Sequence, residues 1–285
     1  MAKRLPPWVR SRLPSAEDQA QISSWTYQRG LATVCQEARC PNRGDCFHRR
    51  TATFLILGPR CTRNCRFCAV EHGTPAPVAL DEPLRVASSV KALGLKFAVI
   101  TSVTRDDLPD GGANVFGETI EAIRRECPGT GIEVLVPDFQ GSEDALRAVV
   151  EASPDVLNHN LETVPRLYPQ LRQGASYERS LELLRRVRTW APKMWTKSGI
   201  MVGVGETPDE ILGLVRDLVS VGCQVLTIGQ YLQPSMLHHP VERYLHPDEF
   251  EELKALAMAQ GMAKVVAGPL VRSSYHAGET INDLA

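Results

Sequence analysis

Residues 53–68 read Thr-Phe-Leu-Ile-Leu-Gly-Pro-Arg-Cys-Thr-Arg-Asn-Cys-Arg-Phe-Cys and carry the main signal for the architecture of the chain. The apolar run Thr53–Leu57 predicts a short buried strand. Three cysteines follow directly, spaced Cys61-x3-Cys65-x2-Cys68. In folds built from parallel strands, binding and chemistry occur at the carboxyl ends of the strands, so this segment predicts a site at such an end.

The alternation of strand and helix continues beyond this segment. Longer stretches with helical periodicity lie between short apolar runs, for example Glu178–Trp190 and Asp209–Val221. The second helix has a strong start signal, because Thr207 can cap it, Pro208 suits its first turn and Glu210 completes a capping box. The predicted strands are Thr53–Leu57, Phe97–Thr101, Ile132–Pro137, Val156–Asn158, Ser198–Val202, Val225–Ile228 and Lys264–Ala267.

Strands that alternate with helices indicate βαβ units and a parallel sheet. The number of units fits a barrel or an open, partial barrel better than a long flat sheet. We therefore predict an α/β fold of the partial (β/α)6 TIM-barrel type. The predicted regions are an N-terminal extension with a cysteine motif at 1–50, the barrel at 51–268 and a C-terminal segment at 269–285.

The composition is that of an ordinary globular protein. The 285 residues are 43% hydrophobic and 23% charged, which excludes a disordered chain, a collagen and a coiled coil. The net charge of −1 gives no global basic field for nucleic acid, and no apolar run is long enough to span a membrane. Because Met1–Pro14 lacks the apolar core of a secretion signal, we expect a cytoplasmic protein with no nucleic-acid or membrane partner.

Six of the eight cysteines lie between Cys35 and Cys68, which favours metal binding over a disulfide framework. Three thiolates at the spacing of Cys61, Cys65 and Cys68 suit a cubane iron–sulfur cluster and leave one iron open to an exogenous molecule. A structural zinc site would use four ligands, so zinc or free thiols are the alternatives for this triad.

A second triad, Cys35-x4-Cys40-x5-Cys46, precedes the first. Two incomplete sets of ligands favour two clusters, and the alternative is one zinc ion held by four of the six thiols. Cys127 and Cys223 stand alone in the sequence. We expect both to be buried or inert.

The spacing Cx3Cx2C, with Phe67 before the last cysteine, resembles the signature of radical S-adenosylmethionine (SAM) enzymes. Beyond this motif, the sequence resembles the lipoyl synthase family over almost its whole length. The matching segments are Glu37–Cys46, Ala52–Val70, Ile100–Ala113, Val136–Gly141, Asn158–Val164, Thr196–Gly199, Gly205–Thr207, Gly229–Pro234 and Gly268–Ala277.

The resemblance implies two [4Fe–4S] clusters and SAM, with no catalytic residue beyond the cluster ligands. Cys61, Cys65 and Cys68 would hold the radical cluster. The residues Cys35, Cys40 and Cys46 would hold an auxiliary cluster, with a serine of Arg272-Ser-Ser-Tyr275 as its fourth ligand. We favour Ser274 over Ser273. Judged on its residues alone, the segment Arg272–Tyr275 predicts only a turn after the last strand.

The implied activity is that of a transferase in lipoate biosynthesis, which inserts two sulfur atoms at C6 and C8 of a protein-bound octanoyl-lysine. The auxiliary cluster would supply the sulfur and be consumed. The implied partners are an octanoylated lipoyl carrier domain (glycine-cleavage carrier or 2-oxoacid dehydrogenase subunit), an electron donor such as flavodoxin or ferredoxin, and a cluster-repair protein. The alternatives are another radical sulfur-inserting enzyme, such as a biotin synthase, or a non-enzymatic iron–sulfur carrier or scaffold.

Candidate SAM contacts follow from position at the mouth of the predicted barrel. They are Phe67, Gly111, Gly112, Asn158 and Glu162, and the loop Gly203–Glu206 is a further candidate. A helix cap or a tight turn is the alternative for the glycines. We expect the histidines of the loop after the sixth strand, His238, His239 and His246, to be exposed.

Seven arginines and one acid, Asp45, lie between residues 39 and 66. This local excess of positive charge is a solvated face, a balance for anionic clusters or a steering patch for an acidic carrier protein. On the last interpretation, reversing the charge of Arg49 and Arg50 raises the KM for the protein substrate.

Overall fold

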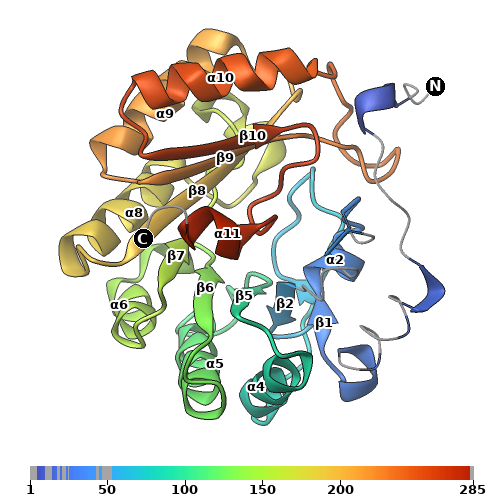
Figure 1. Cartoon of the computed structure of the whole chain (residues 1–285), viewed down its shortest axis with the longest axis vertical. Coiled ribbons are helices and arrows are strands. Elements are labelled where there is room, and N and C mark those ends of the chain that lie inside the picture. Colours follow the sequence, from blue (N-terminus) through green and yellow to red (C-terminus); the bar gives the residue numbers. More distant parts are fainter. Residues whose placement is uncertain are drawn as a thin grey trace.

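The computed structural model describes residues 5–9, 15–17, 20, 24, 26–42, 45–46 and 53–282. Within these residues the main sheet has eight strands in the order β1-β2-β5-β6-β7-β8-β9-β10. The strands from β2 to β10 pair in parallel, and the two-residue strand β1 (Ala32–Thr33) pairs antiparallel with β2. Figure 1 shows the sheet curving around an interior, with the long helices on its outer side.

All seven predicted strands are present. Their bounds are β2 Thr53–Ile56, β5 Phe97–Ser102, β6 Gly131–Leu135, β7 Val156–Asn158, β8 Trp195–Val202, β9 Val225–Gln230 and β10 Lys264–Gly268. Two short strands, β3 (Arg60–Cys61) and β4 (Glu71–His72), form a separate pair at the carboxyl end of β2.

A long helix lies between each pair of successive parallel strands. These helices are α4 Glu82–Leu93, α5 Ala113–Glu126, α6 Glu143–Glu151, α8 Tyr177–Trp190, α9 Pro208–Ser220 and α10 Pro247–Ala259. The described part of the chain therefore holds six β/α units and a final strand, which confirms the predicted partial (β/α)6 barrel. None of the described helices is long and apolar enough to cross a membrane.

The shorter helices occupy the connections and the two ends of the chain. The α-helices are α2 Val34–Glu37, α7 Tyr168–Leu171 and α11 Ala277–Asn282, and the 3-10 turns are η1 Pro7–Val9, η2 Tyr27–Arg29, η3 Phe139–Gly141 and η4 Pro165–Leu167.

Helix α9 shows how neighbouring side chains determine where a helix begins. The Thr207 hydroxyl accepts a hydrogen bond from the backbone N–H of Glu210, and the Glu210 carboxylate accepts one from the N–H of Thr207, as the capping box predicts. The apolar face of the helix is buried against the sheet through Ile211, Leu214, Val215 and Leu218.

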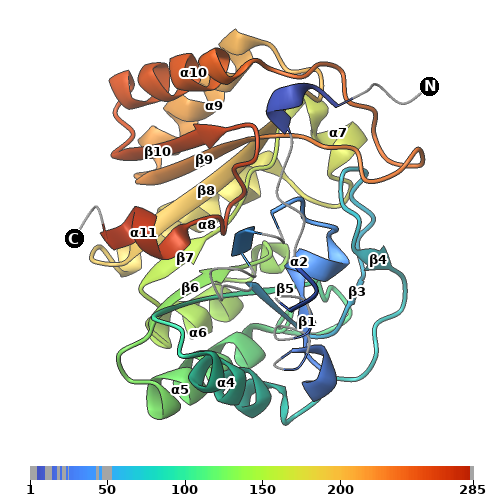
Figure 2. The same ribbon diagram turned by 45° about the vertical axis from the view of Figure 1, so that its right-hand side comes forward.

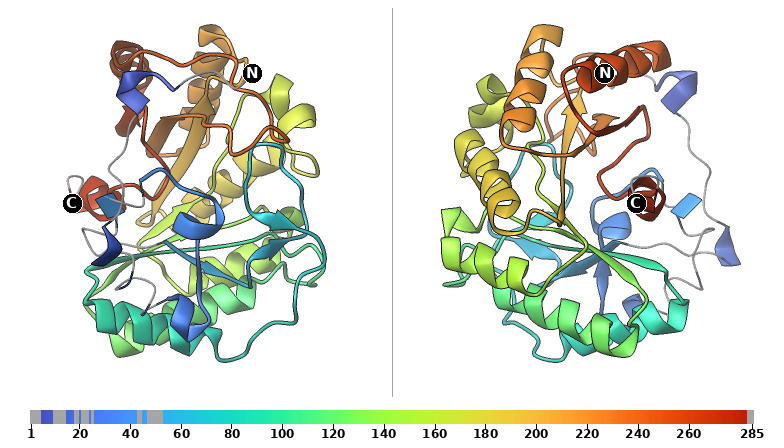
Figure 3. Two further views of the ribbon diagram at one scale, coloured as in Figure 1. Left: turned by 90° about the vertical axis from the view of Figure 1, so that its right-hand side faces the viewer. Right: turned by 60° about the vertical axis from the view of Figure 1, so that its left-hand side comes forward.

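The barrel is open, because the edge strands of its sheet are β1 and β10. The chain after β10 turns back along the inner side of the sheet toward α11, as Figures 2 and 3 show. Glycines in β8 and β9 make room for this segment. A Cβ on Gly229 would lie 2.1 Å from the Val271 carbonyl oxygen, and one on Gly199 would lie 2.7 Å from the Ser273 hydroxyl. The C-terminal segment thus lies against the interior of the barrel.

Candidate functional site

The loop from Cys61 to Cys68 begins where β2 ends in two left-handed residues, Leu57 (φ 67°) and Gly58 (φ 85°). The loop is bound to the segment that follows β5. The backbone N–H and the hydroxyl of Thr62 both donate to the Thr104 carbonyl, at 3.0 and 2.9 Å. The backbone N–H of Asp106 donates to the Thr62 hydroxyl at 3.1 Å. The ligand loop is therefore held at the carboxyl ends of two neighbouring strands.

The three thiols of this loop are free. The Cys61 sulfur accepts backbone N–H groups from Arg63 (3.4 Å) and Thr104 (3.3 Å), and such donors favour a thiolate and a metal-bound sulfur. In the chain without metal, burial raises the pKa of Cys65 to about 11 and that of Cys68 to about 12. A bound cluster would supply the positive charge that the buried thiolates require.

All three thiols line a cavity of about 180 Å³ at this end of the barrel. Its wall also contains Asn160, Glu162 and Arg172. The remaining lining residues come from the same loop and from the ends of β2, β5 and β6: Leu55, Arg63, Asn64, Phe67, Val70, Thr101, Ser102, Val103, Thr104, Leu135, Val136 and Pro137.

The polar wall of the cavity is built around Glu162, which adopts a left-handed backbone conformation (φ 65°). Asn160 Nδ2 donates to its carboxylate at 3.0 Å. Burial raises the pKa of Glu162, and the charge of Arg172 opposes that rise. Arg172 is held by bonds from its guanidinium to the Tyr168 hydroxyl (2.9 Å) and to Ser180 (3.2 Å). A carboxylate, an amide and a guanidinium thus face the cavity beside the thiols, and a left-handed non-glycine residue is a form of strain found at functional sites.

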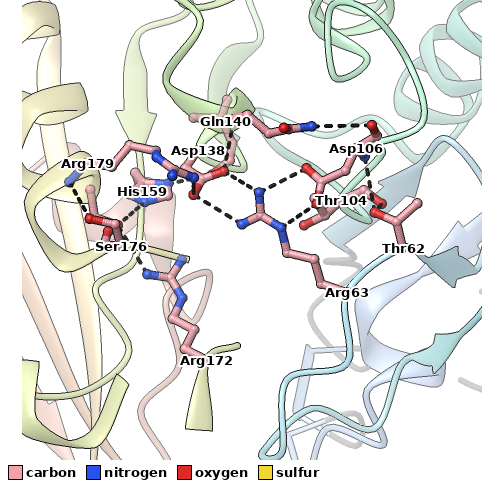
Figure 4. A network of polar contacts seen from close by, with 12 residues as sticks. Thr62, Arg63, Thr104, Asp106, Asp138, Gln140, His159, Arg172, Ser176 and Arg179 are labelled. Atoms are coloured by element: carbon pink, nitrogen blue, oxygen red, sulfur yellow. Dashed lines mark hydrogen bonds and ion pairs between the residues drawn. The ribbon is translucent and has the colours of Figure 1, made fainter. Parts of the chain in front are cut away.

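Arg63 anchors the loop Cys61–Cys68 through a partly buried network of ion pairs, drawn in Figure 4. Its guanidinium bonds both oxygens of Asp106, at 2.6 and 2.9 Å, and both oxygens of Asp138, at 3.1 and 2.7 Å. The Asp138 side chain is fully buried and also pairs with Arg179 at 3.1 Å. Burial alone would raise the pKa of Asp138, but the Arg63 guanidinium outweighs it and holds that pKa at about 2. Arg63 is therefore a paired, half-buried residue and no part of a solvated basic face.

The other arginines of the basic stretch have separate roles. Arg60 is exposed and pairs with Glu71 across the short β3–β4 ladder at 3.0 Å. Arg66 is exposed. Arg43, Arg49 and Arg50 lie outside the described residues, so the charge-reversal prediction at Arg49 and Arg50 stays a prediction.

The first cysteine triad is anchored on the C-terminal segment. Cys35 is buried in α2, while Cys40 and Cys46 are half-buried in the segment that follows, Cys40 in irregular backbone and Cys46 in a helical stretch. Between the last two, Asn42 Nδ2 donates to the Leu270 carbonyl at 2.6 Å. Next to Cys46, Asp45 accepts a bond from the Tyr275 hydroxyl at 3.1 Å. The triad and the segment 270–275, far apart in sequence, are therefore neighbours.

The same C-terminal segment reaches the cavity. The Ser273 hydroxyl donates to Asn160 Oδ1 at 2.9 Å. The Arg272 guanidinium interacts electrostatically with both Cys40 and Glu162, one from each cysteine site. Among the described residues, none forms a hydrogen bond with the Ser274 hydroxyl. The segment therefore joins the two cysteine triads across the interior.

The predicted SAM contacts divide into two groups. Phe67 and Glu162 line the cavity, whereas Gly111, Gly112 and Asn158 do not. Gly112 caps α5 with φ 88°, and a Cβ there would lie 2.2 Å from Leu57. A Cβ on Gly111 would meet Phe139 at 3.0 Å. Gly112 is therefore a helix cap and both glycines are closely packed, while their contact with SAM stays a prediction.

Asn158 belongs to a buried polar cluster deeper in the barrel. Its amide donates to Glu133 at 3.0 Å, and Glu133 pairs with Lys197 at 2.9 Å, with all three side chains fully buried. In the loop Gly203–Glu206, the Glu206 carboxylate accepts the backbone N–H groups of Gly203 and Val204, and the Gly205 carbonyl accepts a bond from Arg166.

Three residues of the site escaped the sequence reasoning: Asn160, Arg172 and Arg63. Asn160 stands in the segment Asn158–Glu162, so its position after β7 was a usable signal. Arg172 follows the short helix α7, and no pattern marks it. Within the described residues, no three His, Cys, Asp or Glu side chains lie close enough to hold one metal ion. The ligands of a cubane cluster each bind a different iron.

Comparison with known proteins assigns the chain to a family. Residues 55–218 match the model of the Radical SAM superfamily. A lipoyl synthase of Rubrobacter xylanophilus is 54% identical over 98% of this chain and 87% of its own length. A lipoyl synthase of Caldanaerobacter subterraneus subsp. tengcongensis is 53% identical over 97% of both chains.

Solved structures support the fold. Streptococcus suis SuiB covers 79% of this chain with a TM-score of 0.57 and 12% identity, over 52% of its own chain. HydG, a maturase of the [FeFe]-hydrogenase, covers 79% with a TM-score of 0.55 and 15% identity, over 58% of its own chain. The curated relatives match almost the whole chain at more than 50% identity, and the solved structures share its fold. The chain belongs to the lipoyl synthase family of radical SAM enzymes.

Proposed function

We propose that the chain forms the lipoyl group by inserting two sulfur atoms, at C6 and C8, into an octanoyl chain carried on a lysine of a lipoyl carrier domain. One observation carries this proposal. The segment 270–275 contacts the first cysteine triad through Asn42 and Asp45, and contacts the cavity of the second triad through Asn160. A site that generates a radical and a site that donates sulfur must serve one substrate carbon, and this segment joins them.

The ligand assignment follows the chemistry of the donors. Cys61, Cys65 and Cys68 would hold one [4Fe–4S] cluster and leave one iron for SAM. Cys35, Cys40, Cys46 and Ser274 would hold a second [4Fe–4S] cluster. When bound, these groups supply the electron that cleaves SAM and the sulfide that is inserted. Ser273 is engaged by Asn160, so Ser274 has the hydroxyl that remains for the cluster.

The cavity wall binds SAM. Its methionyl end carries an ammonium and a carboxylate, which match the Glu162 carboxylate and the Arg172 guanidinium beside the thiols. Asn160 orients the Glu162 carboxylate through its 3.0 Å hydrogen bond. Phe67 supplies an apolar surface of the same wall. The buried surroundings exclude water from the place where a radical would form.

The partners follow from the same reaction. The acceptor is the octanoylated carrier domain of the glycine-cleavage system or of a 2-oxoacid dehydrogenase. Each SAM cleavage consumes one electron, so a low-potential donor such as flavodoxin or ferredoxin is required. A repair protein rebuilds the auxiliary cluster after its sulfide is spent.

The test is an anaerobic reconstitution followed by iron and sulfide counts. We expect about eight irons per chain, four for each cluster. Addition of dithionite, SAM and an octanoyl-lysine peptide should then yield 5′-deoxyadenosine and a lipoyl peptide. Eight irons with deoxyadenosine but no sulfur insertion would disprove the proposed substrate. Four irons or fewer, with no deoxyadenosine, would disprove the two-cluster assignment.

Single cysteine variants separate the two sites. Cys65→Ala should abolish deoxyadenosine formation and lower the iron count to about four. Cys40→Ala should also leave about four irons, but deoxyadenosine should still form without lipoyl peptide. Cys127→Ala is the matched control, because Cys127 belongs to neither triad, and it should behave as the parent chain does.

A further inference from the structure

The loop after β9 carries a turn that packs on the radical-cluster loop. Figure 2 shows this loop reaching over the connection from β3 to β4, which contains Cys65 and Cys68. The backbone N–H of His239 donates to the Arg66 carbonyl at 2.9 Å. Nε2 of His238 lies 3.0 Å from the Cys68 carbonyl. Because a carbonyl only accepts, this ring nitrogen is the donor.

The turn is internally rigid. The backbone N–H of His238 donates to the Ser235 carbonyl at 3.0 Å, and that of Leu237 donates to the Ser235 hydroxyl at 3.3 Å. Nδ1 of His238 accepts the Ser235 hydroxyl at 2.8 Å. His238 and His239 are therefore half-buried, bonded residues, which corrects their predicted exposure, while His246 is exposed and caps α10.

The tip of this turn presents two large apolar side chains to solvent. Met236 is 69% exposed and Leu237 is 89% exposed. A rigid turn with two exposed apolar side chains marks an interaction surface. Next to it, the side chain of Arg66 is exposed and has no carboxylate partner among the described residues. We name Arg66, Met236 and Leu237 the turn patch.

The position of the turn patch selects the kind of partner. Cys68 directs its thiol side to the cavity and its carbonyl to His238, so the patch lies behind the ligand loop. No residue from 233 to 240 lines the cavity. A carrier domain must deliver its octanoyl arm into the cavity, whereas an electron donor needs only a short path to a ligand. One residue and one hydrogen bond connect Leu237 to Cys68.

We propose that the turn patch docks the electron donor, an acidic, low-potential one-electron carrier protein. This inference rests on the proposed function. The donor loses one electron, and that electron breaks one S–C5′ bond of SAM to give methionine and a 5′-deoxyadenosyl radical. The two apolar side chains supply contact area, and Arg66 supplies a charge complementary to an acidic donor. Transient redox interfaces bury little surface, so two apolar side chains contribute a substantial part of the contact area.

The test compares two reductants on the reconstituted enzyme with the octanoyl-lysine peptide. In the double variant Met236→Ser/Leu237→Ser, flavodoxin kept reduced by its NADPH-dependent reductase should support deoxyadenosine formation about tenfold more slowly at subsaturating flavodoxin. With dithionite, which needs no docking surface, the rate should equal that of the parent chain. The matched control is Leu256→Ser/Met258→Ser, which removes the same residue types from the outer face of α10, both 45% exposed.

Three results would overturn the proposal. An equal loss of rate with flavodoxin and with dithionite would show a structural role for the turn. An unchanged rate with both reductants would show that the turn patch does not bind the electron donor. A loss only when an octanoylated carrier domain replaces the peptide, with dithionite as reductant, would assign the surface to the carrier. The proposed function is tested separately, by deoxyadenosine formation in the parent chain with dithionite.

Discussion

At the scale of single residues, the site depends on charges that are buried and paired. Arg63 illustrates this, because it lies between two cysteine ligands and yet bonds two carboxylates from the ends of β5 and β6. The planar guanidinium can bond both carboxylates at once, a geometry that an ammonium cannot reproduce. The ligand loop is thereby set in place by the barrel before any cluster binds.

Replacing Arg63 tests this preorganisation. Arg63→Gln leaves the buried Asp138 with less neutralising charge, so we expect the free energy of unfolding to fall by about 3 kcal/mol. The iron count should fall toward about four, because the auxiliary site does not depend on this loop. Arg63→Lys should give intermediate values. Urea unfolding and iron analysis check these expectations.

The matched control is Arg185→Gln. Arg185 is 55% exposed and pairs with Glu182 on the surface of α8, so its loss should change stability by less than about 1 kcal/mol. A full complement of iron in Arg63→Gln would contradict the role assigned to Arg63.

His159 gives the fold a dependence on pH. Burial lowers the pKa of this histidine to about 4, and its Nδ1–H donates to the Val136 carbonyl at 2.8 Å. Between pH 6.5 and pH 4 the unfolded chain therefore binds a proton that the folded chain does not. Stability should fall as the pH is lowered through this window.

Anaerobic urea unfolding between pH 5 and 7.5 measures this effect. His159→Gln should show a shallower decline of stability with falling pH than the parent chain. The exposed His72 provides the control, because His72→Gln should leave the slope as it is. An unchanged slope in His159→Gln would show that another group dominates.

At the scale of elements, periodicity and capping predicted most of the barrel. Helix α9 begins where Thr207, Pro208 and Glu210 indicated, because its start depends on neighbouring residues alone. Strand β8 begins three residues before the predicted Ser198. The added residues include Lys197, a type of side chain that is usually exposed. It is buried here because it pairs with Glu133 of β6, and the sequence around Lys197 does not reveal that partner.

Among the site residues, too, some positions depend on neighbouring residues in the sequence and others depend on tertiary contacts. Cys61, Cys65 and Cys68 are local in sequence, and their spacing predicted the three thiols that line the cavity. Arg172 and Asn160 join the cavity only because α7 and the end of β7 fold against the ligand loop. Phe139 packs on Gly111 and Leu57 packs on Gly112, and the predicted contact of these glycines with SAM stays a prediction. These tertiary contacts join residues that are far apart in the chain, and no local pattern in the sequence predicts them.

At the scale of the whole molecule, an open barrel leaves its interior accessible from one side. The segment after β10 lies on that side, crosses Gly229 and Gly199, and holds the first cysteine triad through Asn42. The N-terminal and C-terminal parts of the chain are thus in direct contact. Closure of the barrel by further strands would remove the path by which these parts reach the cavity.

Gly229→Ala tests this arrangement of the whole chain. Its Cβ would lie 2.1 Å from the Val271 carbonyl oxygen and 3.2 Å from the Arg272 guanidinium, so the C-terminal segment has to shift away from β9. We expect the auxiliary cluster to be lost while the radical cluster remains, which leaves about four irons per chain. Deoxyadenosine should still form with dithionite, and the lipoyl peptide should not.

Gly213→Ala is the control, because it adds the same methyl group in α9, where a Cβ meets only the end of Arg216 at 3.7 Å. That variant should retain about eight irons and gain up to about 1 kcal/mol of stability, since alanine is the better helix former. If Gly229→Ala also kept eight irons and produced lipoyl peptide, the C-terminal segment would not be what holds the first triad. Loss of deoxyadenosine as well would mean that the two cysteine sites depend on one another through the interior they share.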